Sequence, residues 1–182
     1  CDVVRCTDFC GTTPVLEFLH KGANISNLTG EKITESQVVS AVCATIDGPL
    51  QGGGHFAVAP AWGEPPCYEL FIEARANLTA ESRERLVARI DAQLQQLNCE
   101  YREKRLTGRL DRMTCVTLPE GTWARFTQHE LKLRGSSPDQ YKHTCLVPDL
   151  GFRERLLQQF VNAVHDQPAR TNDRAAALAN TH

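Results

Sequence analysis

The sequence contains no run of apolar residues long enough to cross a membrane. A membrane-spanning helix needs about 20 consecutive apolar residues, and polar or charged side chains interrupt each apolar stretch here well before that length. No signal peptide is recognisable at the start of the chain, which begins Cys-Asp-Val-Val-Arg. We therefore expect no membrane partner and a cytoplasmic location.

An excess of positive charge is also lacking. The 20 Lys and Arg residues are outnumbered by 22 Asp and Glu residues, which gives a net charge of -2. Proteins that bind the phosphate backbone of nucleic acids are usually clearly basic, so we expect no nucleic-acid partner. Methionine is scarce as well, because Met113 is the only one and none begins the chain. We expect these 182 residues to be one domain and a fragment of a longer protein.

The eight cysteines form no Cys-x-x-Cys pair. Structural zinc sites usually use such closely spaced pairs, so the spacing argues against a zinc site. The even count, with Asn-x-Ser/Thr triplets at Asn24, Asn27 and Asn77, is compatible with a secreted, disulfide-linked domain. A catalytic Cys that meets a His only in the fold is a further alternative. Several cysteines lie in apolar runs, however, and we expect them to be reduced and buried.

The chain does contain a regular series of short elements. Residues 3–9 and 15–20 flank a turn signal and predict a hairpin, and residues 56–62 and 67–74 predict a second one. Thr34 is a good N-cap whose capping box Gln37 completes, and Thr79 opens a second helix. Further signals predict a strand at 113–118, a helix beginning at 119–122, a short strand at 144–147 and a last helix capped at 148–149.

This order of elements predicts an α+β fold. The fold would be an antiparallel or mixed sheet with an N-terminal hairpin and packed helices. Residues 98–110 are polar and basic; a solvated surface is the usual role of such charge, and a site for an acidic ligand is the alternative. Residues 166–182 show no periodicity, so we expect a disordered tail.

Two loop lysines are candidate functional residues. Lys142 lies in the polar, turn-rich segment 134–143, from which a cation could reach a neighbouring site and stabilise developing negative charge. Lys32 lies just before the N-cap Thr34, where a helix N-terminus favours anions. For each of them a solvated lysine is the simpler interpretation. The run 52–54 of three glycines lacks the Lys-Ser/Thr pair of a phosphate-binding loop, so we interpret it as a connector.

Several stretches resemble the C-terminal domain of the Gretchen Hagen (auxin-responsive) acyl-acid amido synthetases, of the adenylate-forming superfamily. They lie at 2–5, 14–19, 28–35, 101–110, 121–123 and 135–142. The resemblance implies that residues 1–165 form the C-terminal lid of an ATP-dependent ligase. Such an enzyme uses ATP and magnesium to convert a small carboxylic acid into an acyl-adenylate, which an amine or amino acid then attacks.

The resemblance also implies roles for three residues. Lys142 matches the Lys of a Gln-Tyr-Lys motif that faces the nucleotide when the lid closes, which makes it the catalytic candidate. Lys32 resembles a loop Lys of other adenylate-forming lids. Asp2 matches the end of a Tyr-Arg-x-Gly-Asp motif that holds the ribose, although Cys1 stands where Gly is usual. Both are implied to contribute to cofactor binding.

The resemblance leaves part of the enzyme unaccounted for. No stretch matches the phosphate loop or the acyl pocket of the family's N-terminal domain. We therefore expect this chain to be inactive by itself and to have its own N-terminal adenylation domain as a partner. The alternative is a stand-alone binding or interaction module with the same fold.

Overall fold

The structure is a computed structural model that describes residues 2–21, 24–45, 54–73, 79–135, 137, 139 and 141–162. The tail expected at 166–182 lies outside the described residues, as do Gly52 and Gly53 of the glycine run. Among the helices described, none has both the length and the apolar character that a membrane span requires.

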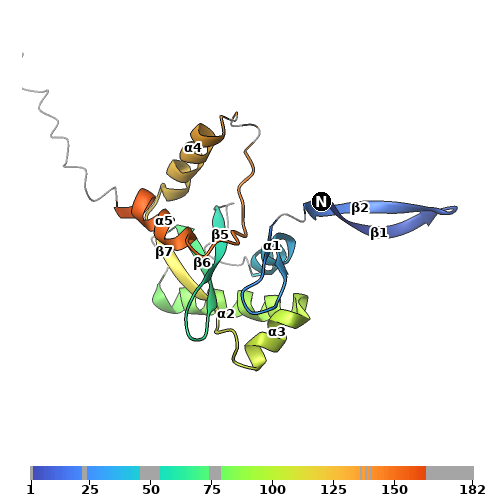
Figure 1. The fold of residues 1–182 in the computed structure, drawn as a ribbon, viewed down its shortest axis with the longest axis horizontal. Coiled ribbons are helices and arrows are strands. Elements are labelled where there is room, and N and C mark those ends of the chain that lie inside the picture. The colour runs from blue at the N-terminus through green and yellow to red at the C-terminus, as the bar shows by residue number, and fades with distance from the viewer. Residues whose placement is uncertain are drawn as a thin grey trace, which may run out of the picture.

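The chain begins with the hairpin that the sequence predicted. Strands β1 (Asp2–Cys10) and β2 (Thr13–Lys21) pair antiparallel. Gly11 in the turn has a φ of 64°, a left-handed conformation that glycine adopts without strain. The two strands form a sheet of their own, and the hairpin extends away from the rest of the fold (Figure 1).

The body is built around a three-stranded sheet of order β5-β6-β7. Strands β5 (Phe56–Ala61) and β6 (Cys67–Glu73) form the second predicted hairpin, and β7 (Thr114–Leu118) joins β6 in parallel. The centres of β5 and β6 are buried on both faces, because their residues are apolar apart from Glu69, which forms an ion pair with Arg153. A second, very short sheet pairs β3 (Ile25–Ser26) with β4 (Ile33–Thr34).

Helices cover both faces of the three-stranded sheet. The side chains of α1 (Glu35–Cys43), α2 (Ala80–Leu97) and α3 (Cys99–Leu106) share one apolar cluster with Val58 and Leu70 of the sheet. Those of α4 (Thr122–Arg134), α5 (Phe152–Leu156) and the π-helix η2 (Leu157–Asn162) share a second cluster with Ala57 and Phe71. The predicted α+β architecture is confirmed.

The start of α1 follows the sequence signal. The hydroxyl of Thr34 accepts a hydrogen bond from the backbone N–H of Gln37 at 3.3 Å, and Gln37 Oε1 accepts one from the N–H of Thr34 at 3.1 Å. The hydroxyl of Thr79 caps α2 by accepting a hydrogen bond from the backbone N–H of Ser82 at 3.2 Å. These caps satisfy N–H groups that would otherwise have no partner at a helix start.

Two predictions near the C-terminal end were wrong. The strand expected at 144–147 is a single parallel bridge between Leu146 and Val58, because the carboxylate of Glu35 accepts the N–H groups of Cys145 and Leu146. The last helix begins at Phe152 rather than directly after the predicted cap. Asp149 instead accepts a hydrogen bond from the N–H of Gly151, within the preceding turn.

Helix α3 was not predicted, because residues 99–106 have no apolar stripe. Only Tyr101 in this helix is buried, and Asn98 caps the helix by accepting a hydrogen bond from the N–H of Tyr101 at 2.8 Å. Tertiary contacts through Tyr101 therefore stabilise a helix that the apolar periodicity of the sequence does not predict.

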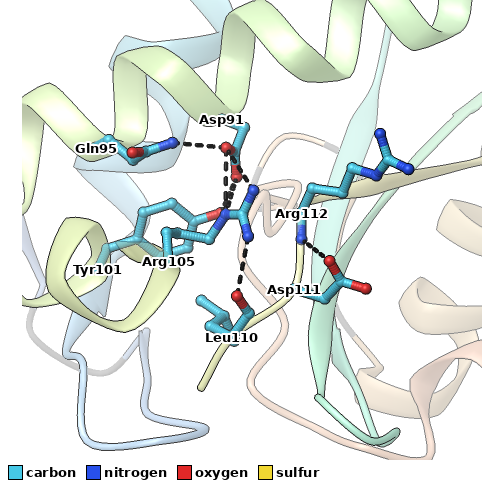
Figure 2. Close-up of polar contacts among 7 residues, drawn as sticks. All are labelled: Asp91, Gln95, Tyr101, Arg105, Leu110, Asp111 and Arg112. Carbon is cyan, nitrogen blue, oxygen red and sulfur yellow. Dashed lines mark hydrogen bonds and ion pairs between the residues drawn. The ribbon is translucent and has the colours of Figure 1, made fainter. Parts of the chain in front are cut away.

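In the basic stretch 98–110, Arg105 connects α3 to α2 and to the segment that follows α3. Asp91 of α2 accepts hydrogen bonds from the hydroxyl of Tyr101 at 2.5 Å, from Arg105 Nε at 3.0 Å and from Gln95 Nε2 at 2.8 Å (Figure 2). Arg105 Nη1 also donates to the carbonyl of Leu110 at 2.9 Å. Burial and the Asp91 carboxylate raise the pKa of Tyr101, so its hydroxyl remains a donor. Arg105 is thus occupied by the protein itself and is not available to an acidic ligand.

Candidate functional site

Lys142 lies in the segment that follows α4. Gly135, with a φ of 59°, ends α4 and begins this segment, of which Ser136, Pro138 and Gln140 lie outside the described residues. Lys142 itself is exposed and borders a cavity of about 260 Å³. The cavity is lined from α4, from residues 141–148 and from the two C-terminal helices, by Trp123, Phe126, Glu130, Arg134, Tyr141, Lys142, Thr144, Val147, Pro148, Phe152, Arg155, Leu156, Gln159 and Phe160.

Three cations line the cavity, and two of them are already paired. Arg134 forms an ion pair with Glu130, one turn earlier in α4, at 2.8 Å. Arg155 pairs with Asp149, and this hydrogen-bonded contact holds the pKa of the Asp149 carboxyl below its usual range. Lys142 has no carboxylate partner within the described part of the chain. Its charge is therefore available to a group that approaches from outside.

The residue after Lys142 attaches the loop to the body of the domain. His143 Nε2 donates a hydrogen bond to the carbonyl oxygen of Phe56 in β5, at 2.7 Å. The His143 ring lies edge-to-face with Trp123 of α4, with 5.0 Å between the ring centroids, and 4.6 Å from the ring of His55. Lys142 therefore projects from a backbone position that is fixed on its C-terminal side.

The attachment continues through Glu35, the first residue of α1. Its Oε1 accepts hydrogen bonds from the N–H groups of Cys145 at 2.5 Å and Leu146 at 3.3 Å, and its Oε2 accepts one from Asn24 at 2.8 Å. The N–H of Val58 donates to the carbonyl of Cys145 at 2.8 Å. The segment that carries Lys142 is thus joined to both the sheet and the start of α1.

Sequence reasoning did not find these two anchoring residues. The available signal for His143 was its position next to Lys142. Glu35 had no such signal, because the backbone groups it binds lie 110 and 111 residues further along the chain.

The structure places the other two predicted site residues elsewhere. Lys32 is exposed. Its backbone is held at the start of α3: its N–H donates a hydrogen bond to the Glu100 carboxylate at 3.2 Å, and its carbonyl accepts one from Asn98 Nδ2 at 2.9 Å. The backbone of Asp2 pairs with Lys21 at the open end of the hairpin, and the Asp2 side chain is not described.

The cysteines do not form a second candidate site. The seven described cysteines are free, but four are exposed and three half-buried, so the expectation of buried cysteines was wrong. Cys43, Cys67 and Cys99 are terminal residues of a helix or strand. Burial, followed by the nearby Glu35 carboxylate, raises the pKa of the Cys145 thiol to about 11, which is the opposite of an activated nucleophile. No group of three His, Cys, Asp or Glu residues that could hold a metal ion is found among the residues described.

The anchoring by His143 predicts a pH dependence of stability. Burial lowers the pKa of His143 from 6.5, and its hydrogen bond to Phe56 opposes this only in part. The unfolded chain therefore binds the proton more readily, so this residue lowers the free energy of unfolding as the pH falls below about 6.5. In urea unfolding between about pH 7 and pH 5, the wild-type chain should lose more stability than the His143→Gln variant. Equal losses would contradict the prediction.

Comparison with known proteins gives matches in sequence family and in fold. Residues 35–150 match the model of the GH3 family C-terminal domain. Two similar solved structures are "GH3.15 acyl acid amido synthetase", at 19% identity and a TM-score of 0.69, and "AtGH3.15 acyl acid amido synthetase in complex with 2,4-DB", at 18% and 0.67. The matches cover 87% and 86% of this chain but only 29% of each of those chains. A search of curated proteins found no match.

Proposed function

Since the chain belongs to the GH3 family, through the C-terminal domain of that family, we propose that it is the lid of an ATP-dependent ligase. The ligase would adenylate a small carboxylic acid and conjugate it to an amine or amino acid. The observation that carries this proposal is the family match over residues 35–150, and the fold likeness to two acyl acid amido synthetases supports it. A cytoplasmic location is part of the same proposal.

The rest of the active site would come from the protein's own N-terminal adenylation domain. The chain spans 29% of the length of the similar synthetases, so most of such an enzyme lies outside it. Among the described residues, the cavity supplies one cation without a carboxylate partner, Lys142, and no cluster of three His, Cys, Asp or Glu residues that could hold magnesium is found. We therefore assign the binding of ATP and magnesium mainly to the N-terminal domain.

Lys142 would act as a cation that arrives when the lid closes over the nucleotide. A positively charged group placed where negative charge develops lowers the energy of the transition state, and closure brings that group only to the committed complex. The attachment through His143 and Glu35 supports this role, because a fixed backbone loses less conformational freedom when the side chain docks. Lys32 and Asp2 would contribute to cofactor binding from the loop before α1 and from the hairpin.

Because ATP and magnesium would be bound mainly by the N-terminal domain, we expect the isolated chain to have no adenylation activity. We expect no enzyme-like release of pyrophosphate from ATP when the chain is incubated with a panel of carboxylic acids, including 2,4-DB, and amino acids. The positive control is the full-length protein, translated from the reading frame extended upstream, which should release pyrophosphate in an acid-dependent manner. Turnover by the isolated chain would contradict the proposal, and so would failure of the full-length protein across the panel.

A further inference from the structure

Glu35, the first residue of α1, contacts two segments that are far apart in the sequence. Its Oε1 accepts hydrogen bonds from the backbone N–H groups of Cys145 at 2.5 Å and of Leu146 at 3.3 Å. Its Oε2 accepts one from Asn24 Nδ2 at 2.8 Å, and its own N–H donates to the Asn24 carbonyl at 3.1 Å. Each oxygen of this carboxylate therefore binds a different segment, which makes Glu35 a bridge between them.

Each of the two bridged segments carries a candidate lysine. Glu35 comes three residues after Lys32, and Cys145 comes three residues after Lys142. The backbone N–H of Lys32 is itself held by the Glu100 carboxylate at 3.2 Å. The bridge therefore helps to set the distance between the backbone positions of the two candidate lysines.

Asn24 holds the Glu35 carboxylate in the orientation that the bridge needs. It contacts Glu35 through both its side chain and its carbonyl, and both residues are half-buried. Asn24 belongs to one of the three Asn-x-Ser/Thr triplets of the sequence. Its Nδ2, the atom that a glycan would modify, donates to Glu35 instead. A hydrogen bond to a charged acceptor is stronger than one between neutral groups, so this contact can fix the carboxylate.

We propose that Asn24 and Glu35 form a clamp between the two lysine-bearing segments, and that Glu35 is a positioning residue for Lys142. Among the described residues, a single bridge to β5 joins the Lys142 segment to the sheet, so the position of this segment depends in part on the clamp. A group misplaced by about 1 Å can lower an enzymatic rate by about 100-fold, which makes such positioning consequential. This inference rests on the proposed function, since the rate concerned is that of the ligase.

Hydrogen exchange in the 182-residue chain tests the clamp without reference to ligase activity. In a Glu35→Ala variant, we expect the amide protons of Cys145 and Leu146 to exchange at least about tenfold faster than in the wild type. The amide of Val147 is the internal control, because it donates to the carbonyl of Val58 at 2.9 Å. Its exchange rate should change by less than about threefold. Unchanged exchange at Cys145 and Leu146, or an equal acceleration at all three amides, would overturn the clamp.

Kinetics of the full-length ligase test whether the clamp acts through Lys142. We expect Glu35→Ala to lower kcat by about tenfold or more, with a change in the KM for ATP of less than about threefold. In a Lys142→Ala background, the same substitution should lower kcat by less than about threefold further, because no ammonium group is left to position. A full additional loss in the double variant would show that Glu35 acts independently of Lys142 and would overturn the positioning role.

Glu81→Ala is the matched control for a carboxylate at the start of a helix. Glu81 lies in the first turn of α2 and pairs with Arg85 of the same helix at 3.2 Å. Its removal should leave kcat unchanged, because neither residue lies in the bridged segments. A loss of kcat as large as that of Glu35→Ala would attribute the effect to helix stability and would count against the clamp.

Glu35→Gln tests whether the contacts or the charge of Glu35 matter. The Gln side chain keeps one oxygen for the N–H groups of Cys145 and Leu146, and its amide can donate to Asn24 Oδ1 once the Asn24 side chain turns over. We therefore expect kcat to stay within about threefold of the wild type. A Gln variant as slow as the Ala variant would assign the effect to the charge and would contradict the clamp.

These measurements separate failure of the inference from failure of the proposed function. A full-length protein that releases no pyrophosphate would contradict the proposed function, while exchange at Cys145 and Leu146 would still decide whether the clamp exists. An active ligase that is slowed by Lys142→Ala but not by Glu35→Ala would contradict the inference alone.

Discussion

Replacement of Lys142 by Ala in the proposed full-length ligase is expected to lower kcat by about 100-fold or more, with a change in the KM for ATP of less than about threefold. Lys142 is exposed and has no carboxylate partner among the described residues. In the proposed mechanism, its charge would act only after the lid has closed. An interaction made only in the closed complex contributes to turnover rather than to the first binding of ATP. Pyrophosphate release at saturating and at limiting ATP measures both quantities.

The matched control for this prediction is Lys132→Ala. Lys132 is an exposed cation in α4 that does not line the cavity, so its removal should change neither kcat nor KM. Because Lys142 is at the surface, its substitution should alter the free energy of unfolding by no more than about 0.5 kcal/mol, which separates a catalytic loss from misfolding. An unchanged kcat in the Lys142→Ala enzyme would remove this residue from the mechanism.

The largest effect on stability is expected for Asp91→Ala. Asp91 is 6% exposed and receives hydrogen bonds from the buried Tyr101 and from Arg105. Removing its carboxylate leaves a guanidinium and a buried hydroxyl without their partner, and breaking a buried ion pair in this way typically costs about 3–5 kcal/mol. That is a large share of the total stability of a domain, which is about 5–15 kcal/mol. Urea unfolding of wild-type and variant chains measures the difference.

Asp111→Ala provides the matched control, and Figure 2 shows both carboxylates. Asp111 is exposed, and its carboxylate accepts a hydrogen bond only from the N–H of the adjacent Arg112, at 2.7 Å, among the described hydrogen bonds. Its removal should cost about 0.5 kcal/mol or less. If the two variants lose similar amounts of stability, the contacts of Asp91 do not hold α3 against α2.

The sequence by itself determined the elements whose signals are local. The hairpin β1–β2, the hairpin β5–β6 and the capping box of Thr34 and Gln37 depend on turn residues and on side chains at most three positions apart. Lys142 was identified on similar grounds, from a polar loop and a short motif resemblance. Whether it acts on a nucleotide remains the prediction that its substitution tests.

The tertiary structure decided everything that depends on partners distant in the chain. Helix α3 is held by Tyr101 and Arg105, which meet Asp91 on another helix. The strand predicted at 144–147 is reduced to a single bridge, because two of its N–H groups bind Glu35. His143 anchors the Lys142 loop through a carbonyl 87 residues earlier. Periodicity and capping report only on neighbours within about one helical turn. A hydrogen bond between residues that are distant in the chain therefore cannot be predicted from periodicity or capping.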